Sequence, residues 1–299
     1  MEHCADSATN SAMPPTMIEI APNVFVETGF QRVVVGAVLT AAGWLCIDTP
    51  PLPADARAWL ISLQAISDQP VRYVINTDGH RDRILTCALF DAPVLAHEAA
   101  ARPLFGLGRN FMAQSASELT GDEQTFLQIA NTRFTPPQIT YSTSLYVEIG
   151  GRELVLLSQP SACAGSAWVA LPEERVLFVG DTVCLNQPPF IQDGCTAQWL
   201  EALRRLQDGT YAGWTIVSGR DGVISPAALG PLVEVLEAAQ AGVAELVEAS
   251  GTRADVAALV GGLMARYPAC VGRERAQAER RLLAGLEAMF DGLNGASHA

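Results

Sequence analysis

The segment VRYVINTDGHRDR, Val71–Arg83, carries the most information about this chain. Its first half, Val71–Asn76, has the β-branched and aromatic composition of a buried strand. Its second half, Thr77–Arg83, is a polar loop that places one imidazole among several charged side chains. Loops held by a core strand often carry binding or catalytic groups. The segment therefore predicts a functional loop at the end of an internal strand.

Short strands and helices alternate on both sides of this segment. The expected strands are 23–28, 32–40, 44–48, 71–76, 94–96, 144–149, 153–157, 166–170, 175–179 and 215–218. The expected helices are 54–66, 84–90, a segment from Glu98, a flap within 102–130, 197–206 and the sequence from Pro226 onward. Because each half of the chain runs from strands to helices, we expect an α/β (α+β) fold with two sheets face to face and helices outside.

Three regions are expected along the chain. Residues 1–17 are polar and predict a loosely ordered leader, without the positive start and apolar run of a signal peptide. Residues 18–225 are expected to form the main domain. Residues 226–299, rich in Ala, Leu and Glu, predict a helical segment packed on the same domain.

Composition excludes several classes of function. The chain has 299 residues and a formal net charge of −13, which argues against nucleic-acid and anionic-membrane partners. All 19 basic residues are arginine, so mechanisms that need a Schiff-base or phosphate-loop lysine are excluded. The seven cysteines are scattered without a CxxC pair, which is typical of reduced thiols in a cytoplasmic protein.

Three further motifs accompany the loop: GWLCIDTP (Gly43–Pro50), AGSAWVALPEERVLFVGD (Ala164–Asp181) and TIVSGRDG (Thr215–Gly222). In order and spacing, the four motifs resemble the metallo-β-lactamase fold superfamily over residues 20 to 225. The resemblance implies a four-layer αβ/βα sandwich with a helical C-terminal extension. It also implies hydrolysis of esters, thioesters, lactams, lactones or phosphodiesters by a metal-bound hydroxide, where the metal site is intact.

The resemblance implies where the family's metal ligands would fall. The first-metal positions are Asp78, His80 and Ala162, the second-metal positions are Asp82, Arg83 and Arg220, and the bridging carboxylate is Asp181. A complete binuclear site of this family uses five histidines. Apart from His3 and His298 near the termini, this chain has only His80 and His97. The resemblance therefore predicts a degenerate site without the two metals, and a pseudoenzyme.

Arginine can replace the charge of a missing metal, because it stays protonated and binds carboxylates through two N–H groups. We expect a salt-bridge cluster in the old cleft. Its members are Asp82 and Asp181 with Arg83 and Arg220, joined by Asp78, Arg81 and Asp221. The cleft is then retained as this cluster or as a binding site for a small molecule or a protein partner, without a cofactor.

Two enzymatic alternatives stay open. Asp78, His80 and Asp181 could hold one zinc, iron or manganese ion. Alternatively, Asp78 or His80 could act as a general base while Arg83 or Arg220 stabilises an oxyanion. The mononuclear site would suit a hydrolase or a redox enzyme. If the chain is a hydrolase, we expect the ester, thioester or lactone class.

Other reactive side chains are assigned structural roles. Cys163 and Cys184 are expected to be buried thiols, and His97 to have a capping or surface role. The run RERAQAERR, Arg273–Arg281, alternates charge and predicts a solvated helix face.

Overall fold

The computed structural model describes residues 17–108, 110–191 and 195–296, so the expected leader lies outside the described residues except for Met17. The strands are β1 (Ile18–Ala21), β2 (Val24–Glu27), β3 (Val35–Thr40), β4 (Gly43–Ile47), β5 (Val71–Ile75), β6 (Val94–His97), β7 (Ile139–Tyr141), β8 (Ser144–Ile149), β9 (Arg152–Ser158), β10 (Ala167–Leu171), β11 (Val176–Gly180), β12 (Thr215–Ser218) and β13 (Gly222–Ile224). The helices are α1 (Pro53–Ile66), α2 (Arg81–Ile84), α3 (Glu98–Ala101), α4 (Phe111–Leu119), α5 (Glu123–Ala130), α6 (Thr196–Gln207), α7 (Gly230–Glu248), α8 (Ala257–Met264) and α9 (Gly272–Ala296). Short 3-10 turns are η1 (Cys87–Phe90), η2 (Arg102–Leu104), η3 (Pro226–Leu229) and η4 (Arg253–Val256).

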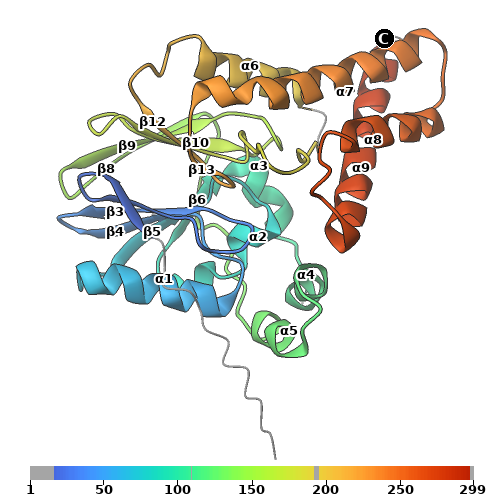
Figure 1. Ribbon diagram of the computed structural model, residues 1–299. Coiled ribbons are helices and arrows are strands. Elements are labelled where there is room, and N and C mark those ends of the chain that lie inside the picture. Colours follow the sequence, from blue (N-terminus) through green and yellow to red (C-terminus); the bar gives the residue numbers. More distant parts are fainter. Residues whose placement is uncertain (1–16, 109, 192–194, 297–299) are drawn as a thin grey trace, which may run out of the picture.

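The strands form two mixed sheets that pack face to face (Figure 1). One sheet has the order β1-β2-β3-β4-β5-β6-β7 and the other β13-β12-β11-β10-β9-β8. Their facing sides bury one apolar cluster that includes Val38, Leu45 and Leu156. The sheets approach so closely that a Cβ at Gly36 would lie 2.4 Å from the Phe178 ring.

Helices cover the outer face of each sheet, as the four-layer prediction requires (Figure 1). On one side, Trp59 and Leu63 of α1 pack in a cluster with Trp44 of β4. On the other side, Trp199 of α6 and Leu236 of α7 belong to a cluster with strands β10 and β11. The predicted αβ/βα sandwich with a C-terminal helical extension is confirmed.

The C-terminal region contributes α7, α8 and α9. The segment Pro226–Glu248 is long and apolar enough to cross a membrane by length and composition alone, but five side chains of α7 are buried within this chain. Helix α9 lies beside the sandwich (Figure 1). A Cβ at Gly285 would lie 1.4 Å from the Ile191 carbonyl oxygen, so the bare α9 backbone packs directly on the segment after β11.

The structure departs from the expected elements in short segments. The expected helix 84–90 is two turns, α2 and η1. Strands β1, β7 and β13, each of three or four residues, were not expected.

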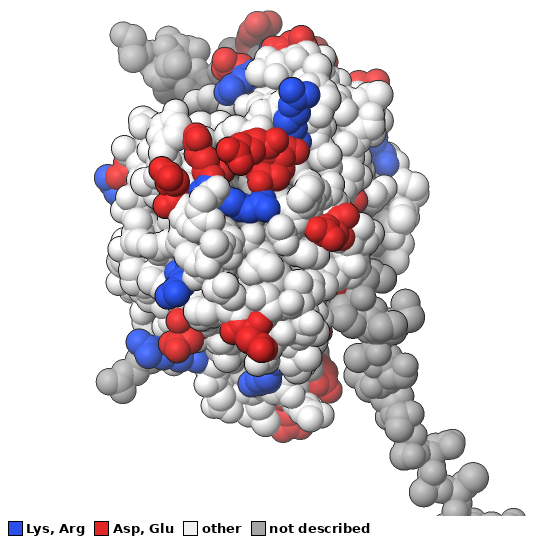
Figure 2. Space-filling view, turned by 90° about the vertical axis from the view of Figure 1, so that its left-hand side faces the viewer, with Lys and Arg blue, Asp and Glu red and all other residues white. Residues whose placement is uncertain are grey.

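Charge is unevenly distributed over the surface. Figure 2 shows the face at the left of Figure 1, where acidic side chains gather in a patch with a few basic side chains beside it. This view agrees with the net charge of −13.

Candidate functional site

The site is built where neighbouring parallel strands β4 and β5 end. Asp48 follows β4 with a φ of +58°, and Thr77 follows β5. The backbone N–H of Thr77 donates to Asp48 Oδ1 at 2.8 Å, and its hydroxyl donates to Oδ2 at 2.7 Å. Burial raises the pKa of Asp48, although the neighbouring Arg83 opposes this effect. These two bonds fix the orientation of the buried Asp48 carboxylate.

Arg83 is fully buried at the centre of the site. Its Nη1 donates to Asp48 Oδ2 at 2.6 Å, and its Nη2 donates to Asp181 Oδ1. Its Nε lies 3.5 Å from Asp78 Oδ1. One guanidinium therefore contacts three buried carboxylates.

Arg220 binds both oxygens of Asp181, and it shares Oδ1 with Arg83. Its Nε and Nη2 lie 2.7 Å and 2.6 Å from the two oxygens of Asp181. Its Nη1 donates to Asp82 Oδ2 at 2.5 Å and also to the carbonyl of Arg32, a residue held at a φ of +74°. Burial alone would raise the pKa of Asp181, but Arg220 and Arg83 hold that pKa well below its usual value.

His80 completes the cluster. Its Nδ1 lies 2.8 Å from Asp78 Oδ2 and 3.3 Å from Asp181 Oδ2. Burial alone would lower the pKa of His80, but these two carboxylates outweigh burial and hold the pKa well above its usual value. The two carboxylates therefore favour the protonated imidazolium form of His80.

Gly219 leaves the space that the Arg83 guanidinium occupies. A Cβ at this position would lie 2.5 Å from Arg83 Nη2 and 2.8 Å from Nη1. The guanidinium cannot move aside, because carboxylates hold it on both sides. The glycine is thus part of the cluster, although it contributes no polar side chain.

We expect Gly219→Ala to lower the free energy of unfolding by about 1–3 kcal/mol, because the added methyl group overpacks a fixed site. Urea denaturation measures this change. Gly261→Ala in α8 is the control, since nothing lies within 4 Å of its Cβ position. If Gly219→Ala and Gly261→Ala unfolded at the same urea concentration, the tight packing around Arg83 would be contradicted.

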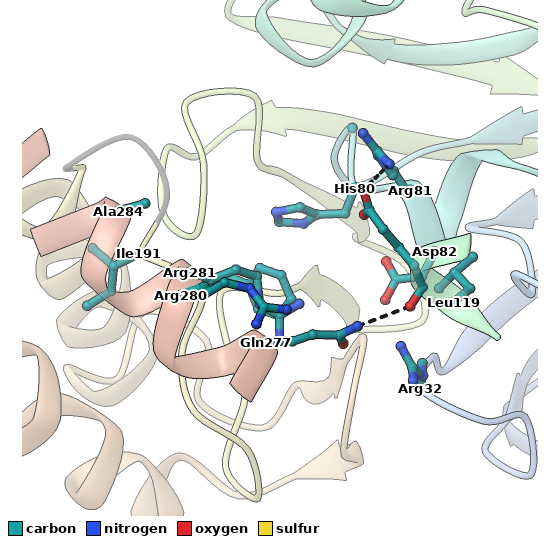
Figure 3. Close-up of a pocket in the computed structure, with 13 residues that line it drawn as sticks. Arg32, His80, Arg81, Asp82, Leu119, Ile191, Gln277, Arg280, Arg281 and Ala284 are labelled. Atoms are coloured by element: carbon teal, nitrogen blue, oxygen red, sulfur yellow. Dashed lines mark hydrogen bonds and ion pairs between the residues drawn. The ribbon is translucent and has the colours of Figure 1, made fainter. Parts of the chain in front are cut away.

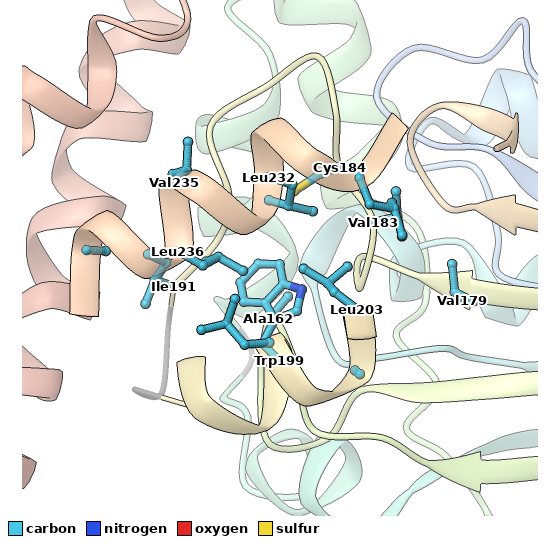
Figure 4. Packing of buried hydrophobic residues seen from close by; sticks show 14 of the residues in the cluster. Ala162, Val179, Val183, Cys184, Ile191, Trp199, Leu203, Leu232, Val235 and Leu236 are labelled. Carbon is cyan, nitrogen blue, oxygen red and sulfur yellow. The ribbon is translucent and has the colours of Figure 1, made fainter. Parts of the chain in front are cut away.

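The third first-metal position is apolar. Ala162 is 1% exposed, and it lies in a hydrophobic cluster with Val183 and Trp199 (Figure 4). Its side chain offers no ligand atom. The expected buried thiols Cys163 and Cys184 are indeed buried, and burial raises the pKa of both.

Two residues that were expected to join the cluster do not. Arg81 pairs instead with Glu118 at 2.6 Å, and Asp221 accepts bonds from the Leu185 N–H and the Asn186 amide. Asp48 was missed, although the motif Gly43–Pro50 contains it. His97 caps α3 by accepting from the Ala99 N–H, as expected.

A cavity of about 600 Å³ opens beside the cluster (Figure 3). His80 and Asp82 line one side, while Gln277, Arg280 and Arg281 of α9 line another. The prediction of a solvated helix face holds for Arg273, Glu274, Arg280 and Arg281, which are exposed, but this face also borders the cavity. The alternating charges were consistent with a surface helix, but they did not reveal that one side of this helix borders a cavity.

The residues do not fit the family's pair of metals. Asp78, His80 and Asp181 place ligand atoms within 4.8 Å of one another, close enough to share one metal ion. However, both oxygens of Asp181 already accept from guanidinium groups, and the protonated Nδ1 of His80 points at the same carboxylates. Three cations balance four carboxylates to within one charge: Arg83, Arg220 and His80 against Asp48, Asp78, Asp82 and Asp181.

Comparisons with known proteins agree with this architecture. The family model of the metallo-beta-lactamase superfamily matches residues 28–224. A metallo-beta-lactamase family protein from Thermus thermophilus superposes with a TM-score of 0.64 at 21% identity, over 93% of this chain and 96% of that one. A beta-lactamase domain protein from Burkholderia ambifaria gives 0.66 at 17% identity, over 96% and 91%.

A metallo-beta-lactamase from Pontibacter korlensis gives a TM-score of 0.55 at 20% identity, over 75% of this chain and 99% of that one. A search of curated proteins finds no significant match. The family model covers well over half of the chain and includes strands β3 to β13 of the two sheets. The chain belongs to the metallo-β-lactamase superfamily.

Proposed function

We propose that this chain is a metal-independent member of the superfamily that lacks the binuclear hydrolase activity and uses its cleft to bind a small molecule. One observation carries the proposal: guanidinium groups of Arg83 and Arg220 hold both oxygens of Asp181, the carboxylate at the bridging position. A metal could bind there only by displacing these buried cations.

The energetics of buried charge support the same conclusion. Asp78, Asp181 and Arg83 have side chains that are at most 2% exposed. Buried ions are tolerated when they are paired and hydrogen-bonded, and they are costly when they are not. The cluster's own residues balance its charge to within one unit, which supports folding without an added cation.

A mononuclear metal enzyme is the second candidate, because Asp78, His80 and Asp181 converge within 4.8 Å. A ligand histidine must be neutral to bind a metal. Here the carboxylates raise the pKa of His80 well above its usual value and favour the protonated form. The metal-independent proposal has the stronger support, because both oxygens of Asp181 already accept hydrogen bonds from Arg83 and Arg220.

We expect no hydrolysis above buffer with 4-nitrophenyl acetate, nitrocefin or a lactone, with or without added zinc or manganese. Without a metal to lower the pKa of water, hydroxide is not available at neutral pH by the family's route. The matched variant is Asp181→Asn. Hydrolysis by the native chain that this variant abolishes would contradict the proposal. Loss of that activity on chelation would identify the mononuclear enzyme, and survival on chelation would identify metal-free catalysis.

A further inference from the structure

The cavity beside the cluster carries positive charge that the protein does not neutralise. Its lining includes Arg32, Arg81, Arg280 and Arg281 but only Asp82 and Glu118 as acids. Both acids are already paired, Asp82 with Arg220 and Glu118 with Arg81. Arg280 and Arg281 form no ion pair with any residue that the structure describes. The chain as a whole has a net charge of −13, so an excess of arginine over acidic residues around this cavity is opposite to its average composition.

Arg281 is positioned by an aromatic ring. Its guanidinium carbon lies 3.6 Å from the centre of the Phe190 ring, and the Arg220 guanidinium approaches the same ring at 5.8 Å. A guanidinium stacked on a ring still presents the N–H groups at its edge to a ligand. Partial burial lowers the pKa of Arg281 to about 10 and the nearby Arg220 and Arg32 add to this effect, although Asp82 opposes it. A bound anion would relieve this crowding of positive charge.

The cavity also has an apolar wall. Phe190, Ile191, Leu119 and Ala284 contribute to its lining. Its volume of about 600 Å³ is in the range of small-molecule sites. In Figure 3, Arg280 and Arg281 extend from α9, across the cavity from His80 and Asp82. The site thus offers cations on one side and apolar surface beside them.

We propose that this cavity binds a small organic dianion, a carboxylate or phosphate on an apolar or aromatic body, with Arg280 and Arg281 binding the anionic groups. The proposal specifies the ligand class of the small-molecule site and rests on the proposed function in one respect. Because Arg83, Arg220 and His80 leave the cluster with only one net negative charge, the positive charge that an anion meets in the cavity comes from Arg280 and Arg281. Helix α9 lies outside residues 28–224, so the anion ligands come from the C-terminal extension.

Titration calorimetry with phenyl phosphate, phthalate and neutral benzyl alcohol tests the proposal. We expect saturable binding of at least one dianion and none of the alcohol, and the preferred dianion identifies phosphate or carboxylate. Arg281→Gln should weaken that binding about tenfold or more, since it removes a charged hydrogen-bond donor. Arg275→Gln is the matched control, because Arg275 lies on the same helix, pairs with Glu279 and does not line the cavity.

The absence of saturable dianion binding would overturn the proposal, and so would equal affinities for Arg281→Gln and Arg275→Gln. Repeating the titration after exhaustive chelation separates this proposal from the previous one. Binding that chelation abolishes and Arg281→Gln leaves unchanged would mean that a metal holds the anion, and both proposals would fail. A metal in the protein with binding still dependent on Arg281 would overturn the metal-independent proposal alone.

Discussion

Arg83→Ala is expected to lower the free energy of unfolding by about 3–5 kcal/mol, because removing one partner of a buried ion pair leaves the other uncompensated. The substitution deprives Asp48, Asp78 and Asp181 of their shared cation. Most domains are stable by only about 5–15 kcal/mol, so the variant should be close to unfolding at 37 °C. Urea denaturation monitored by tryptophan fluorescence gives the difference.

Arg275→Ala is the control for this prediction. Its side chain is 37% exposed and pairs with Glu279 on the surface of α9, so its loss should change stability by no more than about 0.5 kcal/mol. If Arg83→Ala is too unstable to purify, the free energy of unfolding of the double variant Arg83→Met with Asp48→Asn can be measured in its place. It should recover part of the lost stability, because it removes one of the unpaired charges. Equal midpoints for Arg83→Ala and Arg275→Ala would contradict the central role of Arg83.

Stability is also expected to fall as the pH rises above about 6.5, the pKa of histidine in an unfolded chain. Asp78 and Asp181 hold the pKa of folded His80 well above that value. The resulting stabilisation is complete below the unfolded pKa and is lost as the pH rises towards the folded pKa. The maximum slope is about 1.4 kcal/mol for each pH unit.

The matched variant for the pH prediction is His80→Gln, which cannot titrate. Its free energy of unfolding should be flatter between about pH 6.5 and pH 8, below the range in which unfolded cysteines ionise. Urea denaturation in buffers across this range compares the two chains. Identical slopes would show that His80 does not carry a proton in the folded protein.

The sandwich was predictable because its signals are local. Val71–Ile75 is a recognisable strand, and the four motifs occur in an order typical of one superfamily. The partnership of Arg83 and Arg220 with Asp181 was also predictable, since charged residues at ligand positions must be compensated when buried. The sequence did contain a signal for Asp48, since this residue ends the strand adjacent to the loop.

The cavity could not be predicted from the sequence, because α9 forms part of it from nearly 200 positions downstream of His80. Charge alternation in Arg273–Arg281 indicates a helix with an exposed face but does not say what that face borders. The contact depends on Gly285, whose missing side chain allows α9 to pack on Ile191. The partners of Arg81 and Asp221 were missed for a similar reason. Each residue lies next to a member of the cluster in its own loop, but its side chain points away from the cluster to other partners.

The metal content of the native chain tests the central claim most directly. The protein should be purified without chelator, dialysed against metal-free buffer and analysed for zinc, iron and manganese by mass spectrometry. If Arg83 and Arg220 replace the metals, each element should be far below one equivalent per chain. About one equivalent that survives dialysis, and that is lost in Asp78→Ala and His80→Ala but kept in Asp221→Ala, would contradict the claim and establish a mononuclear site.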